Sequence, residues 1–305
     1  PKKMSKAPVI LDLGTGFLKV GLSTSQIPDY VIPNCVGRPI LRSDESFSRE
    51  KLKDQMICDE ITNKTRPYLD LTYPVEHGVI KNWEDEELVL DYLWNQKLKI
   101  QPNEHKILVT EAPLNPLENR KKLMEILFEK YNFDSVQVSP QALLVLYAQG
   151  LATGVVVDSG DGVTHIIPVV EGYPISNAIQ HVPVAGREMT LFIADLLKDR
   201  EPQVPPEDRF ITARNIKERY CKVAKHPSTT FHMFDENREK YIEKYEGVSS
   251  KTGKKFQCEV GYERFLAPEV WFSPELVSNE HTTPISVLID RAIQLSPITN
   301  RMQLY

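Results

Sequence analysis

The stretch "VILDLGTGFLKVGL", from Val9 to Leu22, decides the fold, because "VVVDSGDGVTHIIPV", from Val155 to Val169, repeats its pattern. Each stretch runs through apolar residues to an aspartate, then one further residue, two glycines separated by one residue, and a second β-rich run. This order is typical of a β-hairpin with a tight turn. The repetition predicts an internal duplication, with one copy in each of two lobes.

The turn of each hairpin fits a phosphate group. Glycine allows the backbone to adopt positive φ and to approach a ligand closely, and successive N–H groups in such a turn form a concavity that binds anions. Asp12 and Asp158, which end the first strand of each hairpin, suit a Mg²⁺ ion that keeps several of its waters. Lys19, found in the first hairpin alone, adds a positive charge for the phosphates. The pair predicts a nucleotide clamped between the lobes.

A plain hairpin is the alternative for either stretch taken alone. Asp-Gly is typical of an ordinary type I′ turn, and a single copy favours that interpretation over a ligand site. A dinucleotide fingerprint does not fit, because it needs a third glycine and a following helix. Two copies in one chain reverse the balance and favour the nucleotide.

Length and composition exclude several classes of protein. The chain has 305 residues, enough for two lobes, with 41% hydrophobic and 26% charged residues and a net charge of −5. The mildly acidic balance argues against direct binding of nucleic acid through a broad basic face. The apolar runs are too short for membrane insertion or a secretory signal. The four cysteines are scattered without a CxxC pair, so we expect reduced thiols in the cytosol.

Strands and helices alternate along the middle of the chain. We expect strands at 106–110 and 135–138, helices at 117–131 and from Pro140 to Gly150, and further helices over "GREMTLFIADLLKDR" and "ITARNIKERYCKVA". "YEGVSSKTGKKFQCEV" predicts an exposed hairpin that turns at Thr252-Gly253. Alternating strands and helices indicate a mainly parallel sheet with helices packed on it.

Eight stretches resemble the actin family, in family order and at family-like spacing over nearly the whole chain: "LDLGTGFLKVG", "VGRP", "YPVEHGVIKNW", "TEAPLNPLENR", "YAQGLATGVVVDSGDGVTH", "VAGREMT", "IKERYCKVA" and "GYERFLAPEVWF". Sugar kinases and chaperone ATPases share the two-hairpin fold, but "YPVEHG" and "ERFLAPE" are not typical of them. Within the family, the chain is similar to the actin-related proteins of the branch-nucleating complex. Some stretches are similar to the subfamily of actin-related protein two and others to that of three.

The resemblance implies an α/β fold of the actin-like ATPase type, with two lobes, each a mainly parallel or mixed sheet flanked by helices, and a nucleotide cleft between them. It divides the chain into a first lobe at 1–148, with an outer subdomain at about 34–73, and a second lobe at 149–305, with an outer subdomain at about 185–271. The family continues beyond "ITNRMQLY" into a Gly-rich adenine loop and the helices that close the first lobe. We expect that segment to lie outside this sequence, and Arg42–Gln55 to be a solvated loop where actin makes filament contacts.

The resemblance also implies roles for individual residues around ATP or ADP and Mg²⁺. Asp12 and Asp158 would lie near the metal and hold it largely through water, and Gln141 and His165 would orient the water that attacks the γ-phosphate. The phosphates would contact Gly14, Thr15, Gly16, Lys19, Ser159, Gly160, Asp161 and Gly162. The ribose and base would contact Gly186, Arg214, Lys217 and Glu218.

Plainer interpretations of these residues exist. His165 alone would pass as a half-buried strand residue, and Gln141 as a solvent-facing residue at the start of a helix. Pro140 departs from the family's usual pattern before that glutamine, which puts the rate of hydrolysis in question.

The implied function is that of an ATP-binding subunit of an actin filament-nucleating complex, with slow or vestigial hydrolysis. Its partners would be other actin-related and scaffold subunits and the actin filament, in the cytoplasmic cytoskeleton. The alternative is a structural actin-like subunit of another stable assembly (axonemal, dynactin-like or chromatin-remodelling), in a cilium or nucleus, which holds nucleotide without turnover. A small-molecule kinase of the same superfold is a third hypothesis, for which no candidate motif for a catalytic acid is found.

Overall fold

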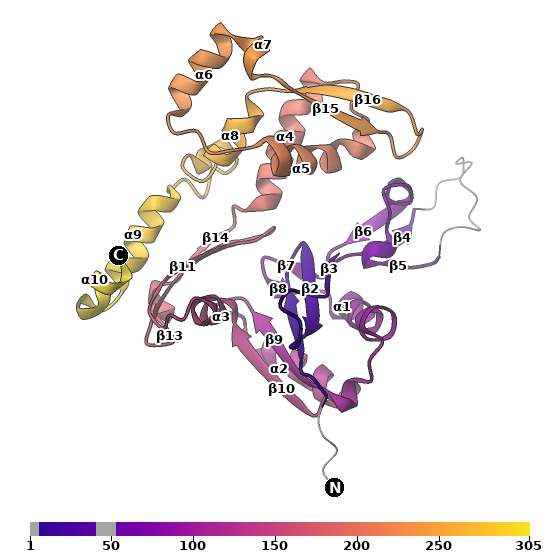
Figure 1. Ribbon diagram of the computed structural model, residues 1–305, viewed down its shortest axis with the longest axis vertical. Helices are drawn as coiled ribbons and strands as arrows, with labels where there is room; N and C mark the ends of the chain where they lie inside the picture. Colours follow the sequence, from indigo (N-terminus) through magenta and orange to yellow (C-terminus); the bar gives the residue numbers. More distant parts are fainter. Residues whose placement is uncertain (1–5, 41–52) are drawn as a thin grey trace. The chain divides into compact units, whose positions relative to one another are not determined.

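The computed structural model describes residues 6–40 and 53–305 (Figure 1). The chain forms two compact units, of which the first comprises Pro1–His181 and Arg291–Tyr305 and the second Val182–Asp290. This division differs from the lobe boundary expected after residue 148, which stays a prediction. The greater part of the Arg42–Gln55 loop lies outside the described residues.

The first unit contains a five-stranded mixed sheet with the strand order β10-β9-β1-β2-β3. β1 and β10 both pair in parallel with β9, whereas β2 pairs antiparallel with β1 and with β3. The strands predicted at 9–22, 106–110 and 135–138 are all found. Their bounds are Val9–Leu13 (β1), Phe17–Leu22 (β2), Tyr30–Pro33 (β3), Lys106–Glu111 (β9) and Ser135–Pro140 (β10).

The second hairpin belongs to a separate sheet of the same unit. β11 pairs antiparallel with β12, which also pairs with β13 and β14. Six of the seven residues of β12 are buried, and these include the polar side chains of Thr164 and His165. The strands span Gly154–Ser159 (β11), Thr164–Val170 (β12), Tyr173–Pro174 (β13) and Gln180–Val182 (β14).

Helices follow the strands of the first unit as the alternation predicts. α1 is capped by the side chain of Asn82, which accepts a hydrogen bond from the backbone N–H of Asp85. The helix predicted at 117–131 is α-helical over its first part and continues as a π-helix over Ile126–Lys130. The α-helices span Trp83–Tyr92 (α1), Leu117–Glu125 (α2), Gln141–Ala148 (α3) and Arg301–Leu304 (α10). Five short strands complete this unit, at Val36–Pro39 (β4), Met56–Ile57 (β5), Leu69–Thr72 (β6), Val75–Glu76 (β7) and Val79–Ile80 (β8).

The second unit packs helices against a two-stranded hairpin. The turn between β15 and β16 contains Gly253 with φ of +69°, which confirms the hairpin predicted at Thr252-Gly253. α9 crosses the boundary between the two units. The elements are Gly186–Arg200 (α4), Arg209–Tyr220 (α5), Pro227–Glu236 (α6), Arg238–Tyr241 (α7), Glu243–Val248 (β15), Lys255–Val260 (β16), Glu263–Glu269 (α8) and Ile285–Leu295 (α9).

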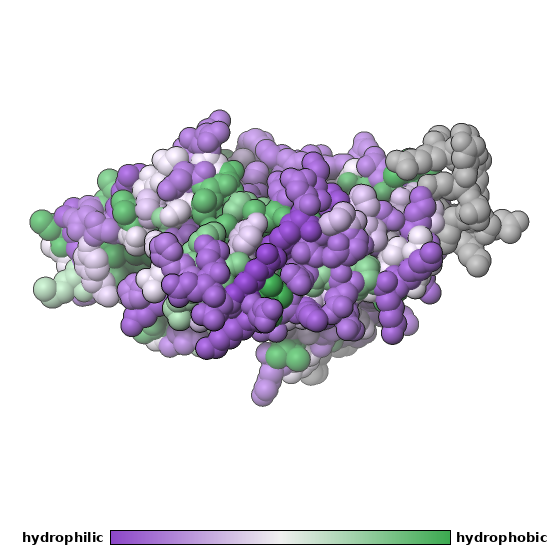
Figure 2. All heavy atoms as spheres, turned by 90° about the horizontal axis from the view of Figure 1, so that it is seen from above, coloured by the Kyte–Doolittle hydropathy of each residue, from purple (hydrophilic) through white to green (hydrophobic). Residues whose placement is uncertain are grey.

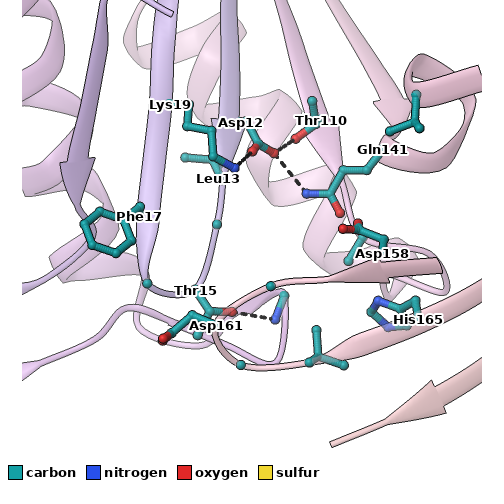
Figure 3. A pocket seen from close by; sticks show the side chains of 18 of the residues that line it. Asp12, Leu13, Thr15, Phe17, Lys19, Thr110, Gln141, Asp158, Asp161 and His165 are labelled. Carbon is teal, nitrogen blue, oxygen red and sulfur yellow. Dashed lines mark hydrogen bonds and ion pairs between the residues drawn. The ribbon is translucent and has the colours of Figure 1, made fainter. Parts of the chain in front are cut away.

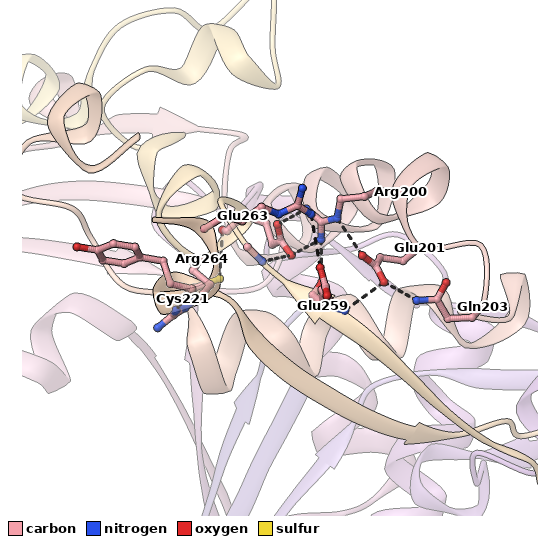
Figure 4. Close-up of polar contacts among 10 residues, drawn as sticks. Arg200, Glu201, Gln203, Cys221, Glu259, Glu263 and Arg264 are labelled. Atoms are coloured by element: carbon pink, nitrogen blue, oxygen red, sulfur yellow. Dashed lines mark hydrogen bonds and ion pairs between the residues drawn. The ribbon is translucent and has the colours of Figure 1, made fainter. Parts of the chain in front are cut away.

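Arg200 joins three elements of the second unit at the end of α4 (Figure 4). Its guanidinium forms a two-pronged ion pair with Glu263, at N···O distances of 2.8 and 2.6 Å, and donates to the backbone carbonyl of Glu259 at 2.8 Å. Its Nε donates to Glu201, which in turn accepts from the backbone N–H of Glu259. Because the Glu263 side chain is fully buried, this network compensates a charge that would otherwise be strongly unfavourable.

The surface is largely hydrophilic on the face that Figure 2 shows, with apolar residues in small groups among the polar ones. Within residues 6–40 and 53–305, no helix is both long and apolar enough to span a bilayer. All four cysteines are free thiols.

Glu86, in α1, is the most unusual group in the core of the first unit. Its side chain is fully buried, and neither carboxylate oxygen has a hydrogen-bond partner in the described part of the chain. Burial raises the pKa of Glu86 to about 7; the negative charge of Asp85 adds to this shift and the side chain of Asn34 opposes it. The Asn34 side-chain oxygen also lacks a hydrogen-bond partner in the described structure.

Glu86→Gln should remove a pH dependence of stability. The pKa of Glu86 is raised from 4.5 in the unfolded chain to about 7 in the folded chain. Protonated Glu86 therefore contributes fully to the free energy of unfolding below pH 4.5. This contribution falls by about 3 kcal/mol in all as the pH rises to 7. We expect the variant to be more stable than the unsubstituted chain at pH 8 but similar at pH 4.5, by urea unfolding.

The exposed Glu84 on the same helix provides the control. Glu84→Gln should keep the pH dependence of the unsubstituted chain. An unchanged pH dependence in Glu86→Gln would contradict the assignment of this titration to Glu86.

Candidate functional site

A cavity of about 440 Å³ lies in the first unit, at the turns of the two repeated hairpins (Figure 3). This volume is within the usual range for sites that bind small molecules. The structure therefore brings together the two motifs that the sequence singled out. The lining residues are Asp12, Leu13, Gly14, Thr15, Gly16, Phe17, Lys19, Gly78, Thr110, Ala112, Gln141, Leu144, Val145, Asp158, Gly160, Asp161, Gly162, Val163 and His165.

Three of the four glycines in the two turns serve close approach, and none of the four serves left-handed backbone. None of Gly14, Gly16, Gly160 and Gly162 has φ in the positive region, so the expectation of positive φ in these turns is wrong. In the second hairpin, neither Asp161 nor Gly162 has positive φ, which both central residues of a type I′ turn require. The plain type I′ interpretation of Asp-Gly is therefore excluded as well.

The two turns pack directly against each other. A Cβ atom added to Gly16 would lie 2.7 Å from Asp161, and one added to Gly162 would lie 2.7 Å from Thr15. A Cβ atom on Gly14 would lie 2.3 Å from the Phe17 carbonyl oxygen in its own turn. Side chains at these three positions would push the hairpins apart or distort the first turn, which explains the need for glycine in physical terms.

The turn between β7 and β8 holds both hairpins together, and the sequence reasoning did not foresee this role. His77 and Gly78 both have positive φ, at +47° and +78°, as a two-residue type I′ turn requires. The Nδ1 of His77 lies 2.6 Å from the carbonyl oxygen of Gly162, and the N–H of Gly78 donates to the Thr15 hydroxyl at 3.0 Å. The sequence feature that could have indicated this turn is the His-Gly pair within "YPVEHG".

Asp12 is held ionised by three donors (Figure 3). Lys19 donates to it at 2.7 Å, Gln141 at 2.9 Å, and the Thr110 hydroxyl donates to the same oxygen as Gln141. Burial works against ionisation, but these hydrogen bonds outweigh it, so the pKa of Asp12 is lowered. Thr110, at the end of β9, is a site residue that no motif in the sequence indicated.

Asp158 is in the opposite electrostatic situation. Its pKa is raised by burial first and by the negative charge of Asp12 second, with Lys19 opposing the shift. Two carboxylates that disfavour each other's charge are suited to a cation placed near both. Within the described residues, no group of three or more His, Cys, Asp or Glu side chains could hold a metal ion. A pair of carboxylates is the kind of ligand set that Mg²⁺ uses when it keeps several of its waters.

Gln141 and His165 both line the cavity. Pro140 ends β10 and precedes α3, so Gln141 is the first residue of that helix, and its amide N–H group is used by Asp12. His165 is the cross-strand partner of Asp158 and is almost fully buried. Burial, and then the neighbouring His181, lower the pKa of His165 to about 4, so the ring is neutral at physiological pH.

The remaining predicted residues lie outside this cavity. The Ser159 hydroxyl is hydrogen-bonded to that of Thr164 at 2.8 Å, and Ser159 is not a lining residue. The four residues expected at the ribose and base belong to the second unit, where the Lys217 ammonium donates to the Gly186 carbonyl at 2.7 Å. Arg214 and Glu218 lie on α5 with Lys217.

The sequence profile of the family described as Actin matches residues 4–305. The chain belongs to the actin family. Proteins of this family bind ATP or ADP with Mg²⁺, and the α/β fold described above is the actin fold that the sequence predicted.

Three similar proteins are each called Actin-related protein 2. The chain is 44% identical to that of Saccharomyces cerevisiae over 98% of its own length and 75% of the relative. The corresponding values are 42%, 99% and 76% for Acanthamoeba castellanii, and 41%, 99% and 75% for Arabidopsis thaliana.

Gly162→Ala should destabilise the first unit by about 1–3 kcal/mol, because the added methyl group meets Thr15 at 2.7 Å. The nearest atom is Cγ2 of Thr15, which Thr15→Ser removes while keeping the hydroxyl that accepts from Gly78. The double variant should recover most of the loss in thermal unfolding, and Thr15→Ser alone should cost little. A double variant no more stable than Gly162→Ala would argue against direct packing of the turns.

Proposed function

We propose that this chain is an ATP-binding actin-related subunit of an actin filament-nucleating complex, with slow or vestigial hydrolysis. The observation that carries the nucleotide part of the proposal is the direct packing of two glycine turns around one cavity, with a carboxylate next to each turn. The complex is inferred from the relatives, because each of the three described above is called Actin-related protein 2.

The two turns would hold the phosphates. Gly14, Gly16, Gly160 and Gly162 all line the cavity, and backbone N–H groups in glycine-rich turns bind phosphate oxygens well. Asp161 and Thr15 complete the turns, and Ser159 precedes the second. Lys19 lies next to Asp12 and is half exposed, so its ammonium group is available to an anion.

Asp12 and Asp158 would hold Mg²⁺, largely through its waters. When bound, the ion supplies positive charge that offsets the repulsion between phosphates and carboxylates. Thr110 and Gln141 fix the orientation of Asp12 through hydrogen bonds to one of its carboxylate oxygens. Gly186, Arg214, Lys217 and Glu218 of the second unit would contact the ribose and base.

Gln141 and His165 would orient a water for cleavage of the γ-phosphate. With its amide N–H group donated to Asp12, Gln141 keeps its side-chain oxygen for the proton of a water. The neutral ring of His165 offers a nitrogen lone pair for the same purpose. The partners would be other actin-related and scaffold subunits and the actin filament, in the cytoplasmic cytoskeleton. Nothing in the fold or the relatives favours the axonemal, dynactin-like or chromatin-remodelling alternative.

ATP should bind the purified protein in calorimetric titration. Its affinity should be higher in the presence of Mg²⁺ than in the presence of EDTA. Lys19→Met should weaken binding about 10- to 100-fold, the loss expected for one charged hydrogen bond. Asp158→Asn should reduce the difference between Mg²⁺ and EDTA. Lys121→Met, at an exposed ion pair with Glu118 outside the cavity, should bind normally. A protein that binds no ATP under either condition would overturn the nucleotide assignment.

The nucleating role should be tested on the assembled protein. The chain, purified through a tag from its own cells, should bring with it a second actin-related protein and non-actin scaffold subunits. That assembly should shorten the lag of actin polymerisation in an ATP-dependent way, whereas the isolated chain should not. An intact assembly that leaves the lag unchanged would overturn the nucleating role while leaving nucleotide binding standing.

A further inference from the structure

His165 is joined to a second histidine that no motif indicated. Its Nε2 lies 3.0 Å from Nδ1 of His181, a hydrogen-bonding distance. The ring centroids are 5.0 Å apart and the planes are inclined by 56°, so the rings meet through nitrogens and are not stacked face to face. His165 lies on β12 and His181 on the paired strand β14, so the sheet fixes the contact.

This contact restricts what His165 can offer to the cavity. Two ring nitrogens at hydrogen-bonding distance share a single proton, because two lone pairs or two N–H groups facing each other would repel. The Nε2 of His165 is therefore committed to His181. Only Nδ1 is left for a water, and its state follows from which ring supplies the shared proton.

We propose that His181 is a positioning residue: its Nδ1 accepts a hydrogen bond from the Nε2–H of His165, which leaves Nδ1 of His165 as a hydrogen-bond acceptor for the attacking water. The proposal rests on the proposed function, since it concerns the water-orienting role of the same cavity. The opposite arrangement would make Nδ1 a donor, which cannot receive a proton of the water.

The position of His181 suits this role. His165 is almost fully buried, whereas His181 is exposed. The buried ring is thus held through its neighbour, and the exposed ring can exchange protons with solvent. Because His181 is exposed, its replacement should leave the fold intact, which makes the role open to test.

The test uses two substitutions in the full chain. His181→Phe keeps a ring but removes the acceptor, while His181→Asn restores an amide oxygen near the place of Nδ1. His281→Phe, at an exposed histidine of the second unit, is the matched control. ¹⁵N-histidine NMR, with the His165 signals assigned by His165→Gln, reports which ring nitrogen carries the proton. ATP affinity and single-turnover phosphate release are measured on the same proteins.

We expect His165 to carry its proton on Nε2 in the unsubstituted chain and to be a mixture of tautomers in His181→Phe. In His181→Asn, the Nε2–H tautomer should be restored. Phosphate release should fall about tenfold or more in His181→Phe at unchanged ATP affinity, and recover in His181→Asn. The proposal would be overturned if the His165 tautomer were the same in the unsubstituted and His181-substituted chains. It would also be overturned if these chains released phosphate at equal rates or not at all. Absence of ATP binding in every protein would instead count against the proposed function, with the tautomer result still decisive for the contact.

Discussion

The structure of the site depends on the direct packing of two glycine turns. Gly16 faces Asp161 and Gly162 faces Thr15 with no room for a further carbon atom. This contact brings together the ends of β1 and β11, which lie in separate sheets and carry the two carboxylates. The β7–β8 turn secures it with one hydrogen bond to each hairpin. The proposed phosphate site rests on this geometry, because both turns line the same cavity.

Much of this could be read from the sequence, since the duplication of the hairpins and the strand and helix order are local patterns. The reason for the glycines could not be predicted from the sequence, because positive φ and close approach both select the same residue, glycine. Gly16 and Gly162 are explained only when the other hairpin is in place. Thr110, His77 and His181 were missed for a similar reason, because their roles come from neighbours distant in sequence, while short motifs record neighbours along the chain.

The two carboxylates are unequal before any ion binds. Asp12 receives three side-chain hydrogen bonds and its pKa is lowered, whereas the pKa of Asp158 is raised by burial and by Asp12 itself. The same difference is visible in the sequence only as Lys19, present in one hairpin and absent from the other. The first carboxylate is thus fixed by the protein, and the charge of the second is favoured when a cation is present. Binding of the proposed ion would therefore be coupled to ionisation of Asp158.

The two side chains proposed to orient the water, Gln141 and His165, are each held by a hydrogen bond to a neighbouring side chain. Gln141 is held by Asp12 through its amide, and His165 by His181 through Nε2. Pro140 precedes Gln141 without preventing this, because it ends β10 in register with Glu111 and the helix begins at the next residue. The orientation of the Gln141 side chain is thereby tied to Asp12, and that of the His165 ring to the exposed His181. Changes at these supporting residues can alter hydrolysis while the phosphate turns, and hence nucleotide binding, stay as they are. Under the proposed function, holding a nucleotide and hydrolysing it would consequently be separable properties of this cavity.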